Sequence, residues 1–356
     1  MEPTNTNTNT NTLLQQVLEL LNTISVKTLA QQLNVATGTV QRWIDLENVP
    51  PQYTFDILRI MKRDVDYSVY SPSEKDQFYT PPAVAKYCFE KFKEVVPINV
   101  DEYIFIEPSA GDGSFLGCLP PDMTLAVDIE PRHASVIKED YLKWTPSIGD
   151  KIIVFGNPPF GLRGHIALQF INHSYAFADY VCFILPQLFE SDGKGSPRKR
   201  VQGYHLIHSE KLSADFHTPD PTQKKIPINC VFQIWSKHTT NEDYDIEVPP
   251  TDSIRIYSLS DGGTVATTRN KNRLESCDIY IPSTCFGKEN MRAYSSFEEL
   301  PNRKGYGVVF LKDREQGMSR SRNIDWSSVS FLSTNSAYNL RTSLIYSHLN
   351  QNLSHK

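Results

Sequence analysis

The chain has 356 residues, of which 39% are hydrophobic and 22% charged, and its formal net charge is −5. This length predicts about two domains, and this composition is that of a globular protein rather than a disordered or fibrous one. No apolar run approaches the roughly 18 residues that span a membrane, and the first residues do not form a secretory signal. Because the chain is not basic overall, any nucleic-acid surface must be a local patch of cations.

The first segment, residues 1–12, is mostly a Thr/Asn repeat, and we expect it to be a disordered tail because it cannot bury a core. Residues 13–64 predict a small helical domain. Within it, residues 24–44 have the apolar spacing of a helix-turn-helix. Asn34 falls at the turn, where a left-handed residue is needed, and Thr37 is the expected N-cap of the second helix.

This segment resembles phage-repressor-like helix-turn-helix domains, in which the second helix enters the major groove of DNA. A plain helical bundle or a protein-binding module is the alternative interpretation. If the resemblance holds, the exposed residues of the second helix are the candidate DNA contacts. They are Thr37, Thr39, Gln41 and Arg42.

Residues 65–236 are expected to form the next domain, because short apolar strands alternate there with amphipathic segments, as in a parallel α/β sheet. The expected strands cover residues 103–107, 124–128, 151–155, 180–185 and 229–234. Residues 237–356 are polar and strand-like, with one terminal helix near 343–350, and predict a target-recognition or accessory region. The predicted fold class is therefore α/β and Rossmann-like, with a mostly parallel sheet, a small all-α N-terminal domain and a β-rich C-terminal region.

A loop of small residues follows the first expected strand, which lets the backbone approach a ligand closely. Its glycines are not spaced as in the dinucleotide-binding fingerprint. The carboxylates of Glu107 and Asp112 favour a cationic, phosphate-free ligand, such as the sulfonium and amino group of S-adenosylmethionine. The loop residues expected around this cofactor are Glu107, Pro108, Ser109, Ala110, Gly111 and Gly113.

Two further acidic positions fit the same ligand. Asp128, followed by Ile129, ends the next expected strand about 20 residues on, where an acid can hold ribose hydroxyls. Asp140 can accept a hydrogen bond from the adenine amino group of the cofactor, with Tyr141 against the ring. A solvated loop carboxylate is the alternative for each acid taken alone.

The tetrapeptide Asn157-Pro158-Pro159-Phe160 directly follows an apolar run. The lone pair of an aromatic amine is conjugated into its ring, so two acceptors aimed at its N–H bonds are needed to make the nitrogen nucleophilic. The Asn157 side-chain oxygen and the Pro158 carbonyl can supply them, while the prolines stiffen the loop. Phe160 offers a flat face for a flipped-out base. A proline-stiffened turn is the alternative for the tetrapeptide alone.

These motifs, with the phrase Phe78-Tyr79-Thr80-Pro81-Pro82 before them, occur in the order that is found in gamma-type amino-methyltransferases. Residues 76–160 resemble the type II DNA adenine-N6 methyltransferases of that group. The resemblance implies that Thr80 contacts the cofactor carboxylate, Asp128 its ribose, and Asp140 with Tyr141 its adenine.

The same resemblance implies roles at the target base. Asn157, Pro158 and Phe160 would hold the base, and Phe216 is the candidate for a further aromatic that helps to hold it. The sequence departs from the family at Phe160, where Tyr is more frequent. Phe is also common in RNA adenine methyltransferases, so RNA stays an alternative substrate.

The densest basic run lies after the strand that ends near residue 186, and we expect it on the same rim of the sheet as the tetrapeptide. Cations in a Gly/Ser loop suit phosphate contacts, and a solvated charged loop is the alternative. The run contains Lys194, Arg198, Lys199 and Arg200.

The leading interpretation is an S-adenosylmethionine-dependent enzyme that methylates adenine N6 in duplex DNA. An RNA adenine-N6 methyltransferase and a DNA-binding regulator with a non-catalytic body are the alternatives, and N4-cytosine or protein-glutamine methylation also stay open. The six cysteines form no Cys-x-x-Cys pair, so we expect no metal site and no disulfide framework. We expect a monomer that does not associate with membranes, in the cytoplasm or, in a eukaryotic host, in the nucleus or a viral factory.

Overall fold

The computed structural model describes residues 12–33, 35–72, 74–147, 149, 151–191, 196–219, 225–244, 252–263, 268–332 and 336–350. The chain divides into two compact units, Met1–Gln77 and Phe78–Lys356. In the described parts, every helix is too short or too polar to cross a bilayer. The predicted tail at residues 1–12 lies outside the described residues except for Thr12.

The first unit is helical. Its helices are α1 (Leu13–Leu21), α2 (Val26–Gln32), α3 (Thr37–Asp45) and α4 (Thr54–Ile60). Thr12 caps α1 in a capping box with Gln15, because each residue's side chain accepts from the other's backbone N–H. The apolar faces meet in a small core that includes Leu29, Val40 and Trp43.

The structure corrects one cap in this unit. Ala36 is the N-cap of α3, without a side-chain hydrogen bond, and Thr37 is the first helical residue rather than the cap. Thr37 therefore leaves its hydroxyl free of the capping role that the sequence predicted. Asn34, predicted at the turn, lies outside the described residues.

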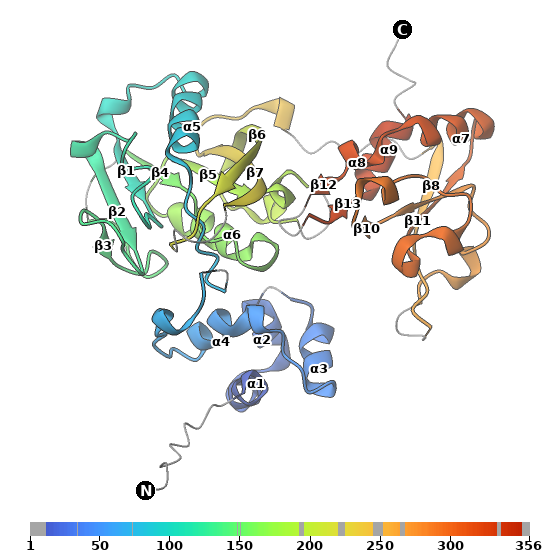
Figure 1. Cartoon of the computed structure of the whole chain (residues 1–356), viewed down its shortest axis with the longest axis horizontal. Helices are drawn as coiled ribbons and strands as arrows, with labels where there is room; N and C mark the ends of the chain where they lie inside the picture. The colour runs from blue at the N-terminus through green and yellow to red at the C-terminus, as the bar shows by residue number, and fades with distance from the viewer. Residues whose placement is uncertain are drawn as a thin grey trace, which may run out of the picture. The chain divides into compact units, whose positions relative to one another are not determined.

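The second unit contains a seven-stranded sheet among its described strands (Figure 1). The strands are β1 (Ile104–Glu107), β2 (Thr124–Asp128), β3 (Ile137–Lys138), β4 (Ile152–Gly156), β5 (Tyr180–Pro186), β6 (His205–Phe216) and β7 (Ile226–Ser236). Their order is β3-β2-β1-β4-β5-β7-β6, with β1 to β5 parallel and β7 antiparallel to both of its neighbours. The strand order reverses between β1 and β4, which is where ligands bind in open sheets of this kind.

Both faces of the sheet are covered, because side chains alternate along each strand. Ile153 and Phe155 of β4 belong to the core on the side of α5 (Pro82–Val95). Ile152 and Val154 belong to the core on the side of α6 (His165–Ser174). The central strands β4 and β5 are buried along their whole length, so their ends are held rigidly.

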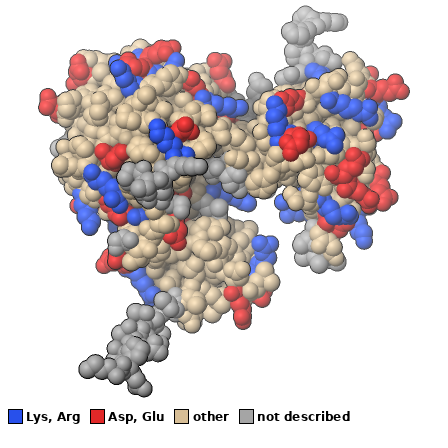
Figure 2. Space-filling model, in the orientation of Figure 1, with Lys and Arg blue, Asp and Glu red and all other residues tan. Residues whose placement is uncertain are grey.

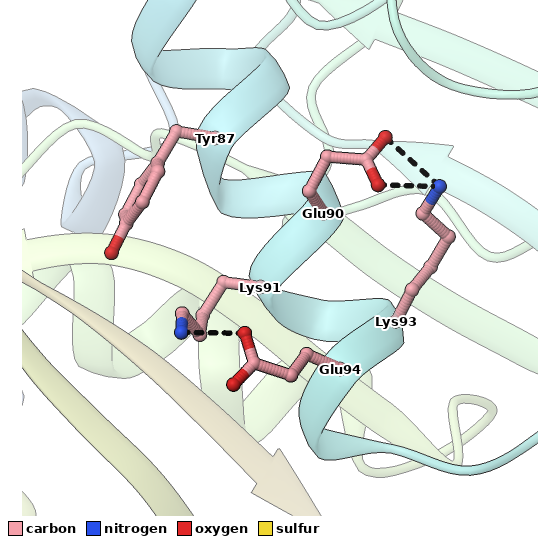
Figure 3. A pocket seen from close by; sticks show the side chains of 5 residues that line it. All are labelled: Tyr87, Glu90, Lys91, Lys93 and Glu94. Atoms are coloured by element: carbon pink, nitrogen blue, oxygen red, sulfur yellow. Dashed lines mark hydrogen bonds and ion pairs between the residues drawn. The ribbon is translucent and has the colours of Figure 1, made fainter.

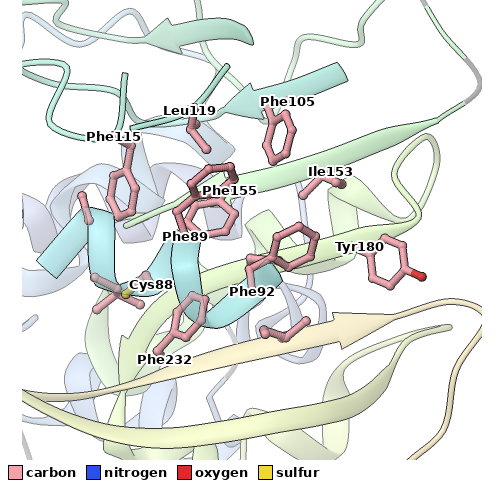
Figure 4. Packing of buried hydrophobic residues seen from close by; sticks show 14 of the residues in the cluster. Cys88, Phe89, Phe92, Phe105, Phe115, Leu119, Ile153, Phe155, Tyr180 and Phe232 are labelled. Carbon is pink, nitrogen blue, oxygen red and sulfur yellow. The ribbon is translucent and has the colours of Figure 1, made fainter. Parts of the chain in front are cut away.

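The core under α5 is rich in aromatic rings, as Figure 4 shows. Phe92 packs edge-on against Phe105 and Phe155, with ring centroids 6.4 and 5.9 Å apart. Phe89 meets the same two rings edge-on. Such pairs add about 0.5–1.5 kcal/mol each beyond the area that they bury, so α5 is fixed firmly on strands β1 and β4.

The C-terminal region is β-rich. The strands β8 (Ile254–Ser260), β9 (Ile279–Pro282) and β11 (Lys304–Phe310) form an antiparallel sheet, and β10 (Thr284–Cys285), β12 (Phe331–Leu332) and β13 (Tyr338–Asn339) form a smaller one. The described residues of this region also include the helices α7 (Arg314–Asn323), α8 (Trp326–Val329) and α9 (Thr342–Asn350). The predicted Rossmann-like fold class is confirmed, as is the expected terminal helix.

Candidate functional site

The two loops that follow β1 and β4 meet at the point where the strand order reverses. Ile106 pairs with Val154 in register, so Glu107 and Asn157 leave adjacent strands at the same edge of the sheet. The Ser109 hydroxyl donates a hydrogen bond to the Asn157 backbone carbonyl at 3.0 Å. The small-residue loop and the tetrapeptide are therefore joined directly.

The Asn157 side chain has one fixed orientation. Its Nδ2 donates to the Phe78 backbone carbonyl at 3.2 Å, and because a carbonyl can only accept, the amide nitrogen must face it. The Asn157 Oδ1 is buried and accepts no hydrogen bond from the residues that the structure describes. The site therefore presents a buried acceptor that a donor on a ligand can satisfy.

The rest of the tetrapeptide is anchored on the same loop. Pro158 is buried, while Pro159 and Phe160 are half-buried, and Phe160 packs against the core under α5. The Phe160 carbonyl accepts from the backbone N–H of Ile166 at 3.2 Å. This bond closes the loop onto the start of α6 and fixes the backbone at Phe160.

The small-residue loop wraps around Asp128. The Asp128 carboxylate accepts from the Gly111 N–H at 2.8 Å and from the Glu130 N–H at 2.7 Å. Burial raises the pKa of Asp128. Gly111 has a φ of +51°, and a Cβ there would lie 2.7 Å from the Tyr79 ring. Only glycine fits between the loop and Tyr79 without displacing the ring.

Four buried polar atoms at this edge have no hydrogen-bond partner among the described residues. They are Tyr79 OH, Thr80 Oγ1, Glu107 Oε2 and Asn157 Oδ1. Buried polar groups are nearly always hydrogen-bonded in folded proteins, so these four atoms are satisfied by ordered water or by a ligand. Glu107 is 2% exposed, and burial, followed by the charges of Asp112 and Asp128, raises its pKa well above the ordinary value. A cation beside Glu107 would reverse that shift, so these residues fit S-adenosylmethionine.

His217 belongs to the site although the sequence did not predict it. Its Nε2 lies 3.0 Å from an Asp112 oxygen, and its backbone forms a bridge with Tyr79, with N–O distances of 2.7 and 3.2 Å. The other Asp112 oxygen accepts from the Ser114 hydroxyl at 2.7 Å. The sequence pointed to this part of the chain only through Phe216, the residue before His217.

The structure corrects the role expected for Phe216. The side chain is 1% exposed and packs inside the core under α5, so no face of its ring is accessible to a base. Phe216 ends β6, and the alternation of side chains along a strand turns the next residue, His217, toward the loop instead.

Only one member of the predicted Asp140–Tyr141 pair is buried in the core. Asp140 is half-buried, accepts from the Leu142 N–H at 3.1 Å and lies 3.5 Å from Lys143 Nζ. Tyr141 is 2% exposed, and its hydroxyl shares a hydrogen bond with Ser174 Oγ at 2.7 Å. Asp140 is therefore the accessible member of the pair.

The remaining predicted cofactor residues line the same loops. Pro108 and Ala110 are buried, and Ile129 is half-buried. Gly113 has a φ of +83°, and a Cβ there would lie 3.0 Å from the His133 ring. Their part in holding a cofactor stays a prediction.

The predicted basic run is only partly available for a ligand. Lys194 lies outside the described residues, and Lys199 is exposed. The Arg198 guanidinium donates to the Tyr244 carbonyl, and burial lowers the pKa of the half-buried Arg200. On the face that Figure 2 shows, basic and acidic side chains are interspersed rather than gathered in one field.

In the N-terminal unit, the predicted contact residues lie on the outer side of α3. Thr37, Gln41 and Arg42 are exposed, and Thr39 is half-buried. Gln41 Nε2 donates to Asp45 Oδ1 at 2.9 Å. These positions leave α3 with a polar face that is free of core packing.

A shallow pocket elsewhere on the second unit lies on the outer face of α5 (Figure 3). Lys91 pairs with Glu94 at 2.6 Å and Lys93 with Glu90 at 2.8 Å, so its charges neutralise each other along the helix. We therefore interpret it as a charged helix surface. No cluster of His, Cys, Asp and Glu suited to a metal ion occurs in the described residues.

Comparisons with known proteins give only distant likenesses. No protein-family model matches the chain, and no curated protein does. Among solved structures, the chain is similar to a candidate RNA methyltransferase of Pyrococcus horikoshii, with 18% identity, a TM-score of 0.36, and coverage of 48% of this chain and 90% of that one. It is also similar to the type IIL restriction-modification enzyme MmeI in complex with DNA, with 9% identity, a TM-score of 0.43, and coverage of 87% and 73%. The 23S rRNA methyltransferase ErmE is 12% identical, with a TM-score of 0.29 and coverage of 46% and 71%.

Proposed function

We propose that the protein transfers a methyl group from S-adenosylmethionine to the N6 amino group of adenine in DNA. The observation that carries the proposal is the Asn157 amide. Its nitrogen is held by the Phe78 carbonyl, which leaves a buried oxygen without a partner. That oxygen is the acceptor that the chemistry of an aromatic amine requires.

The cofactor would lie over the loop that follows β1. Glu107 supplies a buried carboxylate for a positive group, and Thr80 a buried hydroxyl for the carboxylate of the methionine part. Asp128 and Asp140 are the acids for the ribose and the adenine. When bound, S-adenosylmethionine supplies a methyl carbon on a positively charged sulfur, and the carbon–sulfur bond breaks with its electron pair remaining on sulfur.

The residues of the tetrapeptide act on the target base. The Asn157 Oδ1 and the Pro158 carbonyl accept hydrogen bonds from the two N–H groups of the amine, so that its lone pair points at the methyl carbon. Phe160 stacks on the flipped-out base, which offsets the few kcal/mol that unstacking costs. The methylated nitrogen loses its proton to water after transfer, so the contribution of these residues is positioning and preorganised dipoles.

The N-terminal helices support DNA as the substrate. The polar face of α3 carries Thr37, Thr39, Gln41 and Arg42, as expected of a helix that enters the major groove. The exposed Lys199 would contact phosphate. Removing residues 1–64 should then reduce methylation of duplex DNA while the binding of S-adenosylmethionine persists.

RNA is the second candidate substrate, and the observation that favours it is the phenylalanine at position 160. The experiment that separates the two uses labelled S-adenosylmethionine with duplex DNA, single-stranded DNA, structured RNA and protein in parallel. The products are digested and identified by mass. N6-methyladenine in duplex DNA supports the proposal. Label confined to RNA would show that the substrate is RNA instead of DNA. Label in protein, or cofactor binding without any transfer, contradicts the proposed function.

A further inference from the structure

An exposed arginine stands on the loop that closes the catalytic tetrapeptide. Arg163 lies three residues after Phe160, and its side chain is exposed. Its φ is +55°, in the left-handed region that residues other than glycine rarely adopt. Its guanidinium makes no ion pair or hydrogen bond with the residues that the structure describes.

The path of the loop is set by the two glycines on either side. Gly161 has a φ of +64°, and a Cβ there would lie 2.5 Å from the Ile166 side chain. Gly164 has a φ of +72°, and a Cβ there would lie 2.8 Å from the Phe189 ring. Close packing on both sides therefore fixes the turn, and Arg163 at its tip adopts a backbone conformation that glycine or asparagine would adopt at less strain.

The same rim of the sheet carries a second exposed cation. The turn Leu162–Gly164 contacts the turn Gln187–Glu190. The latter also contacts the turn Arg198–Arg200. Lys199 of that last turn is exposed. Arg163 and Lys199 are therefore exposed cations on turns that are linked through Gln187–Glu190, in a chain whose net charge is −5.

The position of Arg163 restricts what it can bind. Three residues span at most about 11 Å, so the Arg163 backbone stays within one or two nucleotides of a base stacked on Phe160. A planar guanidinium with several donors matches the oxygens of a phosphate, and each nucleotide beside the target base supplies one phosphate. Among the described residues, no acid forms an ion pair with this cation.

We propose that Arg163 binds a backbone phosphate beside the target base, so that the substrate of this site is a nucleic-acid strand and not a protein side chain. This inference rests on the proposed function. It adds to it a residue that determines the substrate class and positions the strand.

The test compares three variants in methyl transfer to an adenine-containing duplex DNA and, if the label enters RNA, to that RNA. Arg163→Asn removes the charge and tolerates the left-handed backbone. Arg163→Lys keeps the positive charge but lacks the planar set of N–H donors of a guanidinium. Lys151→Ala is the matched control, because it changes the net charge equally at the opposite end of β4.

We expect Arg163→Asn to raise KM for the nucleic acid about 10- to 100-fold, the effect of one hydrogen bond to a charged group, with a smaller change in kcat. The slope of log KM against log salt should fall by about 0.7–0.9. Arg163→Lys should be intermediate, and Tm of Arg163→Asn should not fall. If Arg163→Asn and Lys151→Ala have equal KM and salt slopes, or if Arg163→Asn loses Tm and kcat together, the inference is wrong. Wild-type enzyme that labels no nucleic acid would instead contradict the proposed function itself.

Discussion

Replacing Asn157 by alanine isolates the acceptor on which the proposed chemistry depends. The substitution removes one hydrogen bond to the Phe78 carbonyl, of 3.2 Å, which contributes about 1 kcal/mol to folding. It also removes a buried oxygen without a partner, whose desolvation costs about 1–3 kcal/mol. The two terms oppose each other, so we expect Tm to change little.

The effect on the reaction should be much larger. Loss of one preorganised hydrogen-bonding group in a transition state lowers kcat about 10²–10³-fold, or about 2.7–4 kcal/mol. We expect a decrease of that size in single-turnover methyl transfer. The affinity for S-adenosylmethionine, measured by calorimetry, should stay close to that of the wild type. Asn157→Asp would place an acceptor oxygen against the Phe78 carbonyl in place of the donor, so we expect it not to restore the rate.

Two results would refute this reasoning. If Asn157→Ala binds S-adenosylmethionine as poorly as it transfers the methyl group, the tetrapeptide is a structural turn that shapes the cofactor site. If transfer is unchanged, the Asn157 oxygen takes no part in activating the amine.

The other predictions concern the cofactor loop. Because the pKa of Glu107 is raised in the folded protein, stability should fall as pH rises above about 4.5, its ordinary value, and Glu107→Gln should flatten this dependence in a pH series of thermal melts while it weakens cofactor binding. Thr80→Val removes a buried hydroxyl without a partner, so Tm should hold or rise while calorimetry shows weaker cofactor binding. Gly111→Ala places a Cβ 2.7 Å from the Tyr79 ring at a φ of +51° and should destabilise the fold by about 1–3 kcal/mol in denaturant titrations. Gly117→Ala, with its nearest contact at 3.7 Å, is the control and should be close to neutral.

The central strands could be predicted because they are continuous apolar runs. β4 and β5 are buried on both faces, so every residue in them carries the signal. The strand β6 (His205–Phe216) was not predicted, because half-buried and exposed residues such as Glu210 and Lys211 interrupt its pattern at the sheet edge. Likewise, α7 (Arg314–Asn323) buries only Ser321 and has no apolar stripe to indicate a helix.

Some contacts of the candidate site could be predicted from the sequence and others could not. The approach of the loops after β1 and β4 follows from parallel strands ending at one edge, so motif order was enough to bring Glu107 and Asn157 together. The contacts of Phe78 and His217 depend on how distant segments return to that edge, and no local pattern encodes this return. The sequence predicted Phe216 rather than His217 as the site residue. Which of the two side chains faces the loop after β1 depends on how the end of β6 is turned, and the sequence pattern does not show this.

The segment that holds the Asn157 amide packs its side chains on the unit but makes few hydrogen bonds to other segments among the described residues. Tyr79 is joined to His217 by a bridge of two hydrogen bonds, and Phe78 is joined to Asn157 by one. Segments held by so few bonds open locally at lower free energy than the sheet on which they rest. We therefore expect heat to abolish catalysis before the far-UV spectrum changes, with amide exchange at Tyr79 and His217 faster than in β4. The protein would then lose its activity through local opening of the segment at Phe78 and Tyr79, while the rest of the chain is still folded.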